Sequence, residues 1–567
     1  MKKIINRKSL FPILVALGLL ACKTEPEPEK KTIAPSVVLN TATGEYLVKT
    51  GESVELLAIV ENVVNPIFSW KLDGKLVSDR TDYRFHSSRA GEHFIVFRVD
   101  DSNGSVEQQA KITVSDKLPP KITAPAASLI AYVGVDTELT VEAENAEADA
   151  TYVWRLNGEV VSETKSYVFR SEVNDTYAMT VRITTADGAD MRTVSITVIP
   201  EPEPELFFDN GRYRAASNIA ELRQMTVPIG KNLVLAPVVC NIKNPVGFRW
   251  TVDEVVQNAT GEFFNFTPSA KGDYHISVTE TGTGKTAELK VTCTEAEGTF
   301  FRAKTSSGRA YANKVYDYIP APGQFVDFQI GSTYSAALAA MQVKVDGGDA
   351  LWHIGAMGGY WIVGFDHSIA NVENRADFVV NGNAFPGWCE PGIVWVMQDE
   401  NGNGLPDDTW YELKGSETGK AETKQRYAIT YFKPRTIRTN TLWTDNIGGM
   451  GSVDWLGAHG QSYYFPMFIA DDSYTLVGTC LTSTFGISGG LEVSKCYDWG
   501  YVDNGSSVDS RPGGLFWIED AIQADGSPAN LTHIDFVKVH TATTGKGAAV
   551  GEISTEPGCP SDYNFDW

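Results

Sequence analysis

The sequence lacks the patterns of several common metal and redox sites. It contains no C-x-x-C pair and no H-E-x-x-H motif, and only 8 histidines are spread over 567 residues. A zinc ribbon, a thioredoxin-type redox centre and a zincin protease are therefore not expected. After the N-terminal segment, no apolar run reaches the roughly 20 residues that a membrane-spanning helix needs.

Basic residues are also scarce. Lys and Arg total 48 against 71 Asp and Glu, which gives a net charge of −23. This balance excludes binding to a phosphate backbone, and no nucleic-acid partner is expected. What is abundant is glycine (51), tyrosine (22) and tryptophan (13), a mixture that favours turn-rich β-structure and aromatic ligand surfaces.

The N-terminus has the features of an export signal. Four basic residues come first: Lys2, Lys3, Arg7 and Lys8. The apolar run Leu10–Leu20 follows, and Leu19-Leu20-Ala21-Cys22 resembles a lipobox. Residues 1–21 are predicted to be a lipoprotein signal peptide, Cys22 the lipidated residue, and 22–35 a flexible acidic tether. The alternative is an ordinary cleaved signal peptide with an incidental cysteine.

The acidic stretch after Cys22 resembles the surface-export signal of Bacteroidetes lipoproteins. This resemblance implies an outer-membrane, cell-surface location, with membrane contact through the lipid anchor only.

Three similar units follow, at residues 36–116, 121–199 and 205–295. Each has a tryptophan strand, around Trp70, Trp154 and Trp250, and two of these strands end in Asp-Gly or Asn-Gly hairpin pairs. Period-two alternation over many short strands predicts β-sandwiches with each tryptophan in the core. The units resemble PKD-like or immunoglobulin-like domains.

Residues 296–567 differ in composition, because they hold ten of the 13 tryptophans. Many strand-like runs and a single helix candidate, Tyr334–Met341, predict a large jelly-roll-like β-sandwich. The expected fold class is all-β, with three tandem PKD/Ig-like sandwiches followed by this C-terminal ligand-binding domain.

Six cysteines remain once Cys22 is set aside. Cys240 and Cys293 lie in the third unit, on strands expected to face each other, and are predicted to form a disulfide. The other four permit three connectivities that the sequence does not rank: Cys389, Cys480, Cys496 and Cys559.

One loop has the residue pattern of a calcium site. Its candidate ligands are Asp399, Asn401, Asn403, the Leu405 carbonyl, Asp407 and Asp408. Oxygen ligands at this spacing, with a glycine at the sixth position, suit Ca²⁺. The loop departs from an EF-hand, because Trp410 occupies the place of the bidentate glutamate. The alternative is a polar turn without metal.

The sequence offers little for catalysis, and no enzyme is expected. Gly486-Ile487-Ser488-Gly489-Gly490 matches a nucleophile-elbow string, but the strand-like Leu491–Ser494 follows where a helix is required.

Binding is the remaining class of function. The predicted ligand-binding residues combine aromatic rings with polar side chains near flexible backbone: Trp443, Asn446, Trp455, His459, Tyr463, Trp499 and Tyr501. The segment Gly448-Gly449-Met450-Gly451 is expected to be a loop that exposes the first group. The alternative is that many of these aromatics are core residues.

The C-terminal region as a whole resembles a known family. The segments that carry the resemblance are 364–369, 381–385, 390–394, the Asp399 loop with 410–413, 497–503, 534–539 and 551–556. They are similar to the BtuH family of surface lipoproteins. The resemblance implies cobalamin as bound ligand and a TonB-dependent outer-membrane transporter as partner. A carbohydrate-binding or adhesion protein that uses the same aromatic domain remains the alternative.

Overall fold

The computed structural model describes residues 35–566 except 42, 43, 103, 327–330, 349, 350, 386, 489, 490 and 506–513. The predicted signal peptide, Cys22 and nearly all of the tether lie outside the described residues. The chain divides into two compact units, Met1–Leu47 with Gly51–Thr113 and Val48–Thr50 with Val114–Trp567. Among the described residues, no helix combines the length and the apolar composition that crossing a membrane would take.

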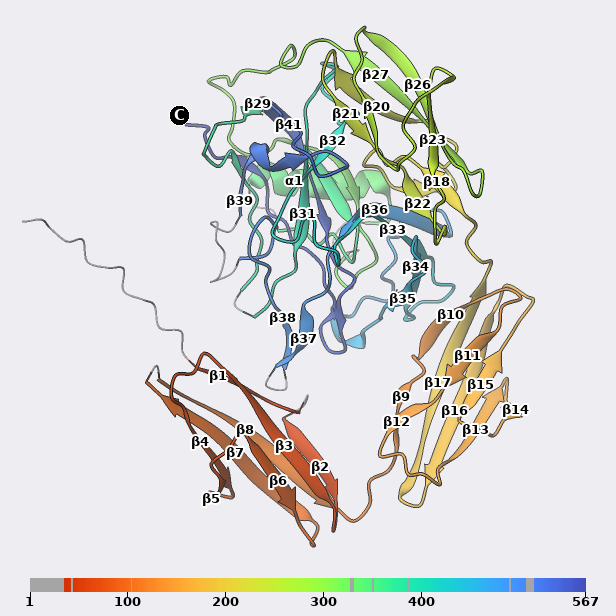
Figure 1. Cartoon of the computed structure of the whole chain (residues 1–567), viewed down its shortest axis with the longest axis vertical. Helices are drawn as coiled ribbons and strands as arrows, with labels where there is room; N and C mark the ends of the chain where they lie inside the picture. The colour runs from red at the N-terminus through yellow and green to blue at the C-terminus, as the bar shows by residue number, and fades with distance from the viewer. Residues whose placement is uncertain are drawn as a thin grey trace, which may run out of the picture. The chain divides into compact units, whose positions relative to one another are not determined.

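The first sandwich has two sheets, with strand orders β1-β3-β6 and β2-β8-β7-β4-β5 (Figure 1). Its strands are β1 (Ser36–Leu39), β2 (Glu45–Lys49), β3 (Ser53–Glu61), β4 (Ile67–Leu72), β5 (Lys75–Ser78), β6 (Asp82–His86), β7 (Gly91–Asp101) and β8 (Gly104–Ser115). Alternate residues of β7, namely Ile95, Phe97 and Val99, are fully buried with Trp70 between the sheets.

The second and third sandwiches repeat this plan. The second contains β9 (Lys121–Ala124), β10 (Ser128–Tyr132), β11 (Thr137–Thr140), β12 (Glu142–Glu144), β13 (Thr151–Leu156), β14 (Glu159–Ser162), β15 (Ser166–Phe169), β16 (Thr176–Thr185) and β17 (Gly188–Ile199). The third contains β18 (Glu205–Phe207), β20 (Arg223–Pro228), β21 (Leu233–Leu235), β22 (Val238–Cys240), β23 (Phe248–Val252), β24 (Val255–Val256), β25 (Phe264–Phe266), β26 (Gly272–Glu280) and β27 (Thr286–Thr294). Trp154 and Trp250 are fully buried, so the prediction that the repeated tryptophans are core residues is confirmed.

The hairpin after each tryptophan strand uses positive φ at both turn positions. Asp73-Gly74 has φ values of 46° and 81°, and Asn157-Gly158 has 51° and 91°. The third sandwich makes the same turn with Asp253-Glu254, at 46° and 66°, although it has no glycine there. These values are those of the turn type whose twist matches a two-residue hairpin.

The C-terminal domain is built around two large sheets, β28-β29-β41-β31-β32-β40 and β19-β36-β33-β34-β35, of which β19 (Arg214–Ala215) comes from the segment between β18 and β20. Its strands are β28 (Lys314–Ile319), β29 (Tyr360–Ala370), β30 (Phe378–Val379), β31 (Gly392–Met397), β32 (Trp410–Leu413), β33 (Lys424–Phe432), β34 (Thr441–Asp445), β35 (Met450–Val453), β36 (Ser473–Cys480), β37 (Phe485–Ser488), β38 (Leu491–Ser494), β39 (Leu515–Phe516), β40 (Ala521–Ile522), β41 (His533–Thr541), β42 (Lys546–Gly547), β43 (Gly551–Glu552) and β44 (Ser561–Asp562), with 3₁₀ turns η1 (Gly457–His459) and η2 (Ile518–Asp520). Tyr360 and Ile362 of β29 pack with Tyr431 and Leu476 between the two sheets, in what is called the inter-sheet core below. The all-β sandwich prediction is confirmed.

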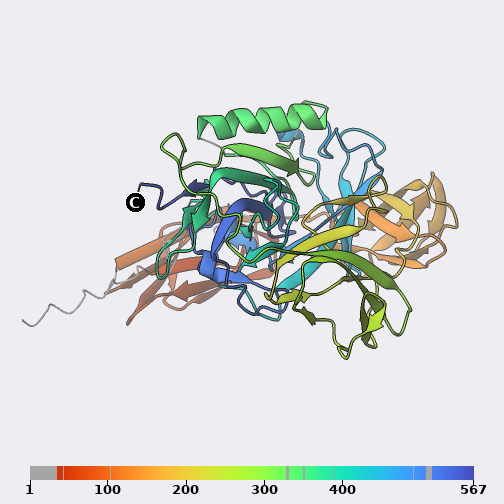
Figure 2. The same ribbon diagram turned by 90° about the horizontal axis from the view of Figure 1, so that it is seen from above.

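The opposite face of the six-stranded sheet is covered by α1 (Tyr334–Gly347), which Figure 2 shows lying along one side of the domain. Thr333 caps its first turn and Gly348, with φ of 68°, ends it. Its buried residues Ala337, Met341 and Val345 pack on Trp361 and its neighbours. The helix is thus longer than the predicted Tyr334–Met341, and its residues line a second core.

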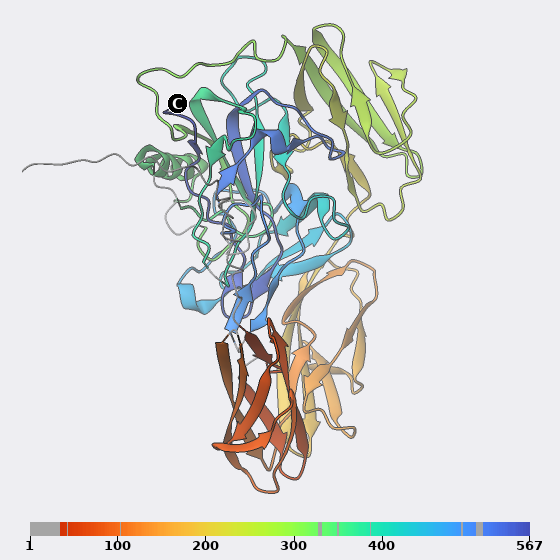
Figure 3. The same cartoon turned by 60° about the vertical axis from the view of Figure 1, so that its left-hand side comes forward.

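The third sandwich and the C-terminal domain form one packed body, side by side in Figures 1 and 3. The connecting strand β19 (Arg214–Ala215) leaves the third sandwich and pairs with β36 of the C-terminal domain. Buried Gln523 accepts from the Val234 N–H at 3.1 Å and donates to the Asn232 carbonyl at 3.0 Å. These bonds fix the two walls of the junction relative to each other.

The cysteines pair differently from the prediction. Cys240 and Cys293 are free, buried thiols, so the predicted disulfide between them is wrong. Cys240 lies on β22 and packs against Ala428 and Val477 of the C-terminal domain, whereas Cys293 lies in the β20-β27-β26 sheet. The disulfide present joins Cys389 and Cys496, whose Cα atoms are 5.1 Å apart.

Candidate functional site

The predicted ligand-binding residues fall in three separate places. Trp443, Trp455 and Tyr463 are half-buried and pack against the inter-sheet core. Asn446 lies at the junction with the third sandwich, as described below. Trp499 is half-buried and Tyr501 is buried in a third place. The side chain of His459 lies outside the described residues.

The predicted loop Gly448–Gly451 is a loop only in its first half: Gly448 and Gly449 lie in the turn of a β-hairpin, and the prediction is wrong for Met450 and Gly451. Met450–Val453 forms β35, paired with β34, and the turn between them is held by Asp445. Its carboxylate accepts from the backbone N–H groups of Ile447 at 3.0 Å and Gly449 at 2.6 Å. Because the hairpin packs on the inter-sheet core, Trp443 and Trp455 are partly covered rather than displayed on a loop.

Tyr501 belongs to a small buried cluster with Ile393, Leu481, Tyr497 and Ala542. Its ring stacks edge-on to Tyr497 with 5.4 Å between centroids, and its hydroxyl accepts from the Glu417 N–H at 2.9 Å. These contacts are those of a packing residue.

The Asp399 loop is closed by its own hydrogen bonds. The Asp399 carboxylate accepts from the N–H groups of Gly402, Asn403 and Gly404 at 2.9–3.1 Å. The Asn401 and Asn403 amides donate to Asp407 and Asp408. Over the described part of the chain, no group of three or more His, Cys, Asp or Glu side chains is arranged to hold a metal. Calcium binding stays a prediction.

Burial disfavours the ionised form of two carboxyl groups in this loop, Asp408 and Glu400. Burial raises the pKa of Asp408 to about 8, a rise that the hydrogen bond from Thr226 opposes and the charges of Asp407 and Asp399 reinforce. Burial likewise raises the pKa of Glu400, and the nearby Asp408 adds to that rise.

Two adjoining hollows, of about 420 and 640 Å³, meet at Asn446. Both are bordered by Asn446, Asn241 and Pro202. The larger is also lined by Tyr132, Glu201, Val239, Ile242, Lys243, Pro245, Glu262, Gln425, Arg426, Ile447 and Gly448. The two hollows together are called the outer groove here. Asn446 itself is fully engaged: its amide donates to the Val239 and Arg426 carbonyls, and its oxygen accepts from the Ala428 N–H.

A β-bulge in β33 separates the outer groove from a second cavity. The register of β33 against β36 shifts between Lys424 and Tyr427, and Arg426 has a φ of 50°. Such bulges redirect side chains, and strained non-glycine residues cluster at functional sites. The Arg426 guanidinium donates to Glu262 at 2.6 Å and to the Ala524 carbonyl at 3.2 Å.

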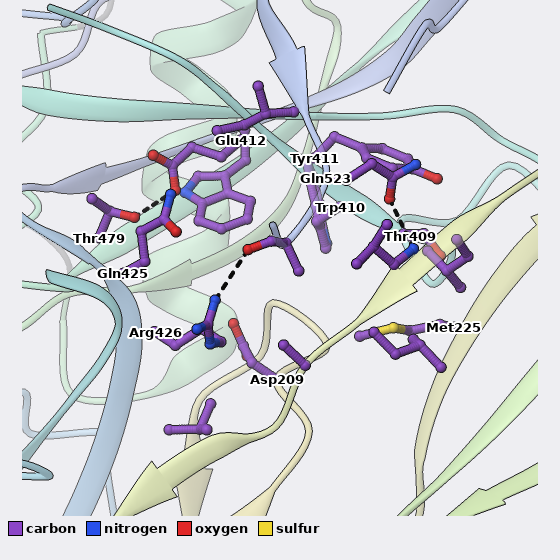
Figure 4. Close-up of a pocket in the computed structure, with 18 residues that line it drawn as sticks. Asp209, Met225, Thr409, Trp410, Tyr411, Glu412, Gln425, Arg426, Thr479 and Gln523 are labelled. Carbon is purple, nitrogen blue, oxygen red and sulfur yellow. Dashed lines mark hydrogen bonds between the residues drawn. The ribbon is translucent and has the colours of Figure 1, made fainter. Parts of the chain in front are cut away.

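Behind the bulge lies a cavity of about 110 Å³, called the inner cavity (Figure 4). The third sandwich contributes Asp209, Met225, Leu233, Val234, Leu235, Ala236 and Val238, and the C-terminal domain contributes Trp395, Thr409, Trp410, Tyr411, Glu412, Gln425, Arg426, Thr479, Ile522, Gln523 and Ala524. Figure 4 shows the Glu412 carboxyl joined to the Thr479 hydroxyl, a bond of 2.5 Å. Burial raises the pKa of Glu412 to about 7. The hydrogen bond from Thr479 and the charge of Arg426 both oppose this rise.

Several of the segments that carry the family resemblance converge on a cluster of carboxyl groups. Asp503 accepts from the backbone N–H groups of Asn383 at 2.8 Å and Glu556 at 3.0 Å. Glu390 accepts from the Ser554 N–H at 3.2 Å. Burial raises the pKa of Asp503 to about 7, and burial together with the Asp503 charge raises that of Glu390. These bonds tie together the ends of distant strands.

Sequence reasoning missed Gln425, Arg426 and Glu412. Gln425 and Arg426 lie in a segment with an ordinary strand pattern. That pattern does not indicate the bulge that turns Arg426 toward Glu262. Glu412 lies in a segment that carries the family resemblance. The opposite wall of the inner cavity comes from the third sandwich, whose sequence showed no functional pattern. Leu491–Ser494, which was predicted to be a strand after the nucleophile-elbow string, is β38 and pairs antiparallel with β37.

Comparison with known proteins identifies part of the chain. Residues 34–101 and 119–185 match the family model of the PKD-like domain. The first two sandwiches are PKD-like domains. No curated protein matches the sequence.

Solved structures with similar sandwiches include the fibronectin(III)-like modules of CbhA from Clostridium thermocellum, at 18% identity and a TM-score of 0.17 over 30% of this chain and 98% of that chain. Three N-terminal domains of the Hoc protein of bacteriophage RB49 match at 14% identity and a TM-score of 0.15, over 46% of this chain and 99% of that one. Drosophila N-cadherin EC1-4 matches at 12% identity and a TM-score of 0.20, over 46% of this chain and 75% of that chain.

Proposed function

We propose that the chain is a BtuH-like cell-surface lipoprotein, anchored to the outer membrane through Cys22, that binds a corrinoid such as cobalamin in the outer groove. It would then pass the ligand to a TonB-dependent transporter. The PKD-like domains ahead of the groove are of a kind that is typically non-catalytic, which agrees with a binding role.

The observation that carries this proposal is the composition of the outer groove. A corrin is a broad disc fringed with amides. Asn241, Gln425 and Lys243 offer hydrogen-bonding groups to such a fringe, while Ile447 and Pro245 offer apolar area. A hollow of about 640 Å³ falls in the size range of small-molecule sites.

The test is a titration of the purified full chain with cyanocobalamin, followed by its visible absorbance. Ile447 is 57% exposed beside the groove, and Ile437, which is 60% exposed and does not line it, provides a matched control. Ile447→Asp is expected to weaken binding at least about tenfold, because a charge then replaces apolar contact area. Ile437→Asp should bind like the unmodified chain. Absence of binding at micromolar cyanocobalamin would reject the proposal.

A carbohydrate is the second candidate ligand. Trp443, Trp455 and Tyr463 pack on one core and leave part of each ring exposed, an arrangement on which sugar rings can stack. Binding on a glycan array, together with no retention of cyanocobalamin, would favour this alternative.

A further inference from the structure

The inner cavity has an unusual combination of walls. Leu235, Val238 and Ile522 give it an apolar lining, and the indoles of Trp395 and Trp410 add aromatic surface. A cavity that was only a packing defect would be lined by apolar groups alone. Here polar side chains line the space as well, and one of them is a carboxyl group of the C-terminal domain.

That carboxyl group belongs to Glu412, which is 5% exposed. Among the described residues, Thr479 supplies the hydrogen bond to Glu412, through its hydroxyl. Arg426, a cationic side chain in the lining, donates its hydrogen bonds to Glu262 and to the Ala524 carbonyl. Its charge opposes the rise in the pKa of Glu412 from a distance, and its donor groups stay with the other two partners.

Three cations act on Asp209, the other carboxyl group in the lining, although burial still raises its pKa. Asp209 accepts from the Gly211 N–H at 2.9 Å, and its charge is opposed by Lys538, Arg223 and Arg214. The nearby Lys538 ammonium is itself held by the Gly211 carbonyl at 2.8 Å. Arg426 acts on the charge of Glu412, whereas three cations act on Asp209, so Glu412 is the less compensated of these two carboxyl groups.

We propose that the inner cavity binds one small organic ammonium ion, whose N–H groups donate to Glu412 and whose apolar body packs on Leu235, Val238 and the indole rings. Indole faces attract cations as well as apolar groups. An apolar cavity of roughly 150 Å³ accepts benzene, so about 110 Å³ suits an amine with four or five carbons. The inner cavity and the outer groove share Gln425 and Arg426 of the bulge, and their other lining residues differ.

Binding of an ammonium ion has a further consequence for Glu412. The cation favours the ionised carboxylate, so a proton held by Glu412 near neutral pH is released when the amine enters. Binding heat then depends on the buffer that takes up this proton, which gives a readout specific to the carboxyl group.

The test is calorimetric titration of the purified full chain at pH 7 with butylamine, in two buffers of different ionisation enthalpy. Butan-1-ol is the uncharged control. Saturable butylamine binding at one site, proton release, and binding of butan-1-ol weaker by at least about tenfold are the expected results. If butylamine does not saturate, or if the alcohol binds equally well, the cavity holds water only and the proposal fails.

Variants locate the site. Glu412→Gln keeps an oxygen for the Thr479 hydroxyl but removes the charge, and should weaken butylamine binding at least about tenfold. Exposed Glu373→Gln changes the net charge equally and should leave binding unaltered. Ala236→Leu fills the cavity from a half-buried position and should abolish binding even if Glu412→Gln folds poorly. Undiminished binding by Ala236→Leu would overturn the proposal. Ile447→Asp, which changes the outer groove, should retain butylamine binding. Failure of the corrinoid proposal can therefore be distinguished from failure of the amine proposal.

Discussion

The indole of Trp443 lies directly over Gly451, its partner across β34 and β35. A Cβ atom at Gly451 would be 2.5 Å from Cζ2 of Trp443, so only glycine leaves room for the ring. An aromatic residue placed across from a strand glycine covers the backbone that the glycine exposes. This relationship explains how Gly451 is accommodated inside β35, directly after the turn that holds Gly448 and Gly449.

Gly451→Ala is expected to destabilise the C-terminal domain by about 1–3 kcal/mol, because the added methyl group must displace the Trp443 ring. Gly486 in β37 is the matched control, since a Cβ there would meet no atom within 4 Å. Gly486→Ala should change the free energy of unfolding by no more than about 0.5 kcal/mol. Denaturant unfolding of both variants measures the difference, and equal stabilities would contradict the contact.

Trp455→Ala should lower stability by about 2–4 kcal/mol, because the ring packs on the inter-sheet core. Its Nε1 also donates to the Gln461 carbonyl at 2.7 Å, a bond that the variant loses. Thermal unfolding monitored by near-UV circular dichroism checks this. A variant with unchanged melting that has lost ligand binding would instead return Trp455 to the ligand site.

Glu412 should make stability depend on pH. Its pKa is raised from 4.5 to about 7 in the folded chain, so between these values the folded state holds a proton that the unfolded chain releases. Its contribution to stability is therefore present below about pH 4.5 and is lost as pH rises through 7. Relative to the unmodified chain, Glu412→Gln should gain on the order of 3 kcal/mol between pH 4.5 and pH 8. Parallel stability curves for the two proteins would contradict this.

The disulfide prediction concerns Cys389 and Cys496, which are 107 residues apart in sequence. A non-reducing peptide map should show this pair joined and four free thiols at Cys240, Cys293, Cys480 and Cys559. Cys389→Ser with Cys496→Ser should cost about 2–4 kcal/mol, because a long loop is no longer closed in the unfolded chain. Cys240→Ser in a separate variant should leave the peptide-mapped pair intact.

Calcium binding by the Asp399 loop remains testable. If the loop holds Ca²⁺, excess chelator should lower the melting temperature of the C-terminal domain by removing a ligand of the folded state. Asp407→Asn should abolish that sensitivity, whereas Asp79→Asn, at an exposed position of the first sandwich, should preserve it. An unchanged melt with no calcium in elemental analysis would reject the prediction.

The repeated sandwiches were predictable from the sequence because their determinants are local. Alternation along β7, β16 and β26 places every second side chain inside, and a tryptophan strand followed by Asp-Gly or Asn-Gly specifies the hairpin. The same local pattern showed that β38 follows the elbow string as a strand.

Other features depend on contacts between segments that are distant in the sequence. Gly451 is accommodated in β35 under the Trp443 ring, and Cys240 is a free thiol that packs with Ala428 and Val477 of the C-terminal domain. Glu412 faces a cavity because residues 209–238 of the third sandwich, more than 170 positions earlier in the chain, close the other side. Each sandwich could thus be predicted from its own strand alternation and turns, because these are local. The sites between the sandwiches depend on non-local packing, which no local pattern encodes.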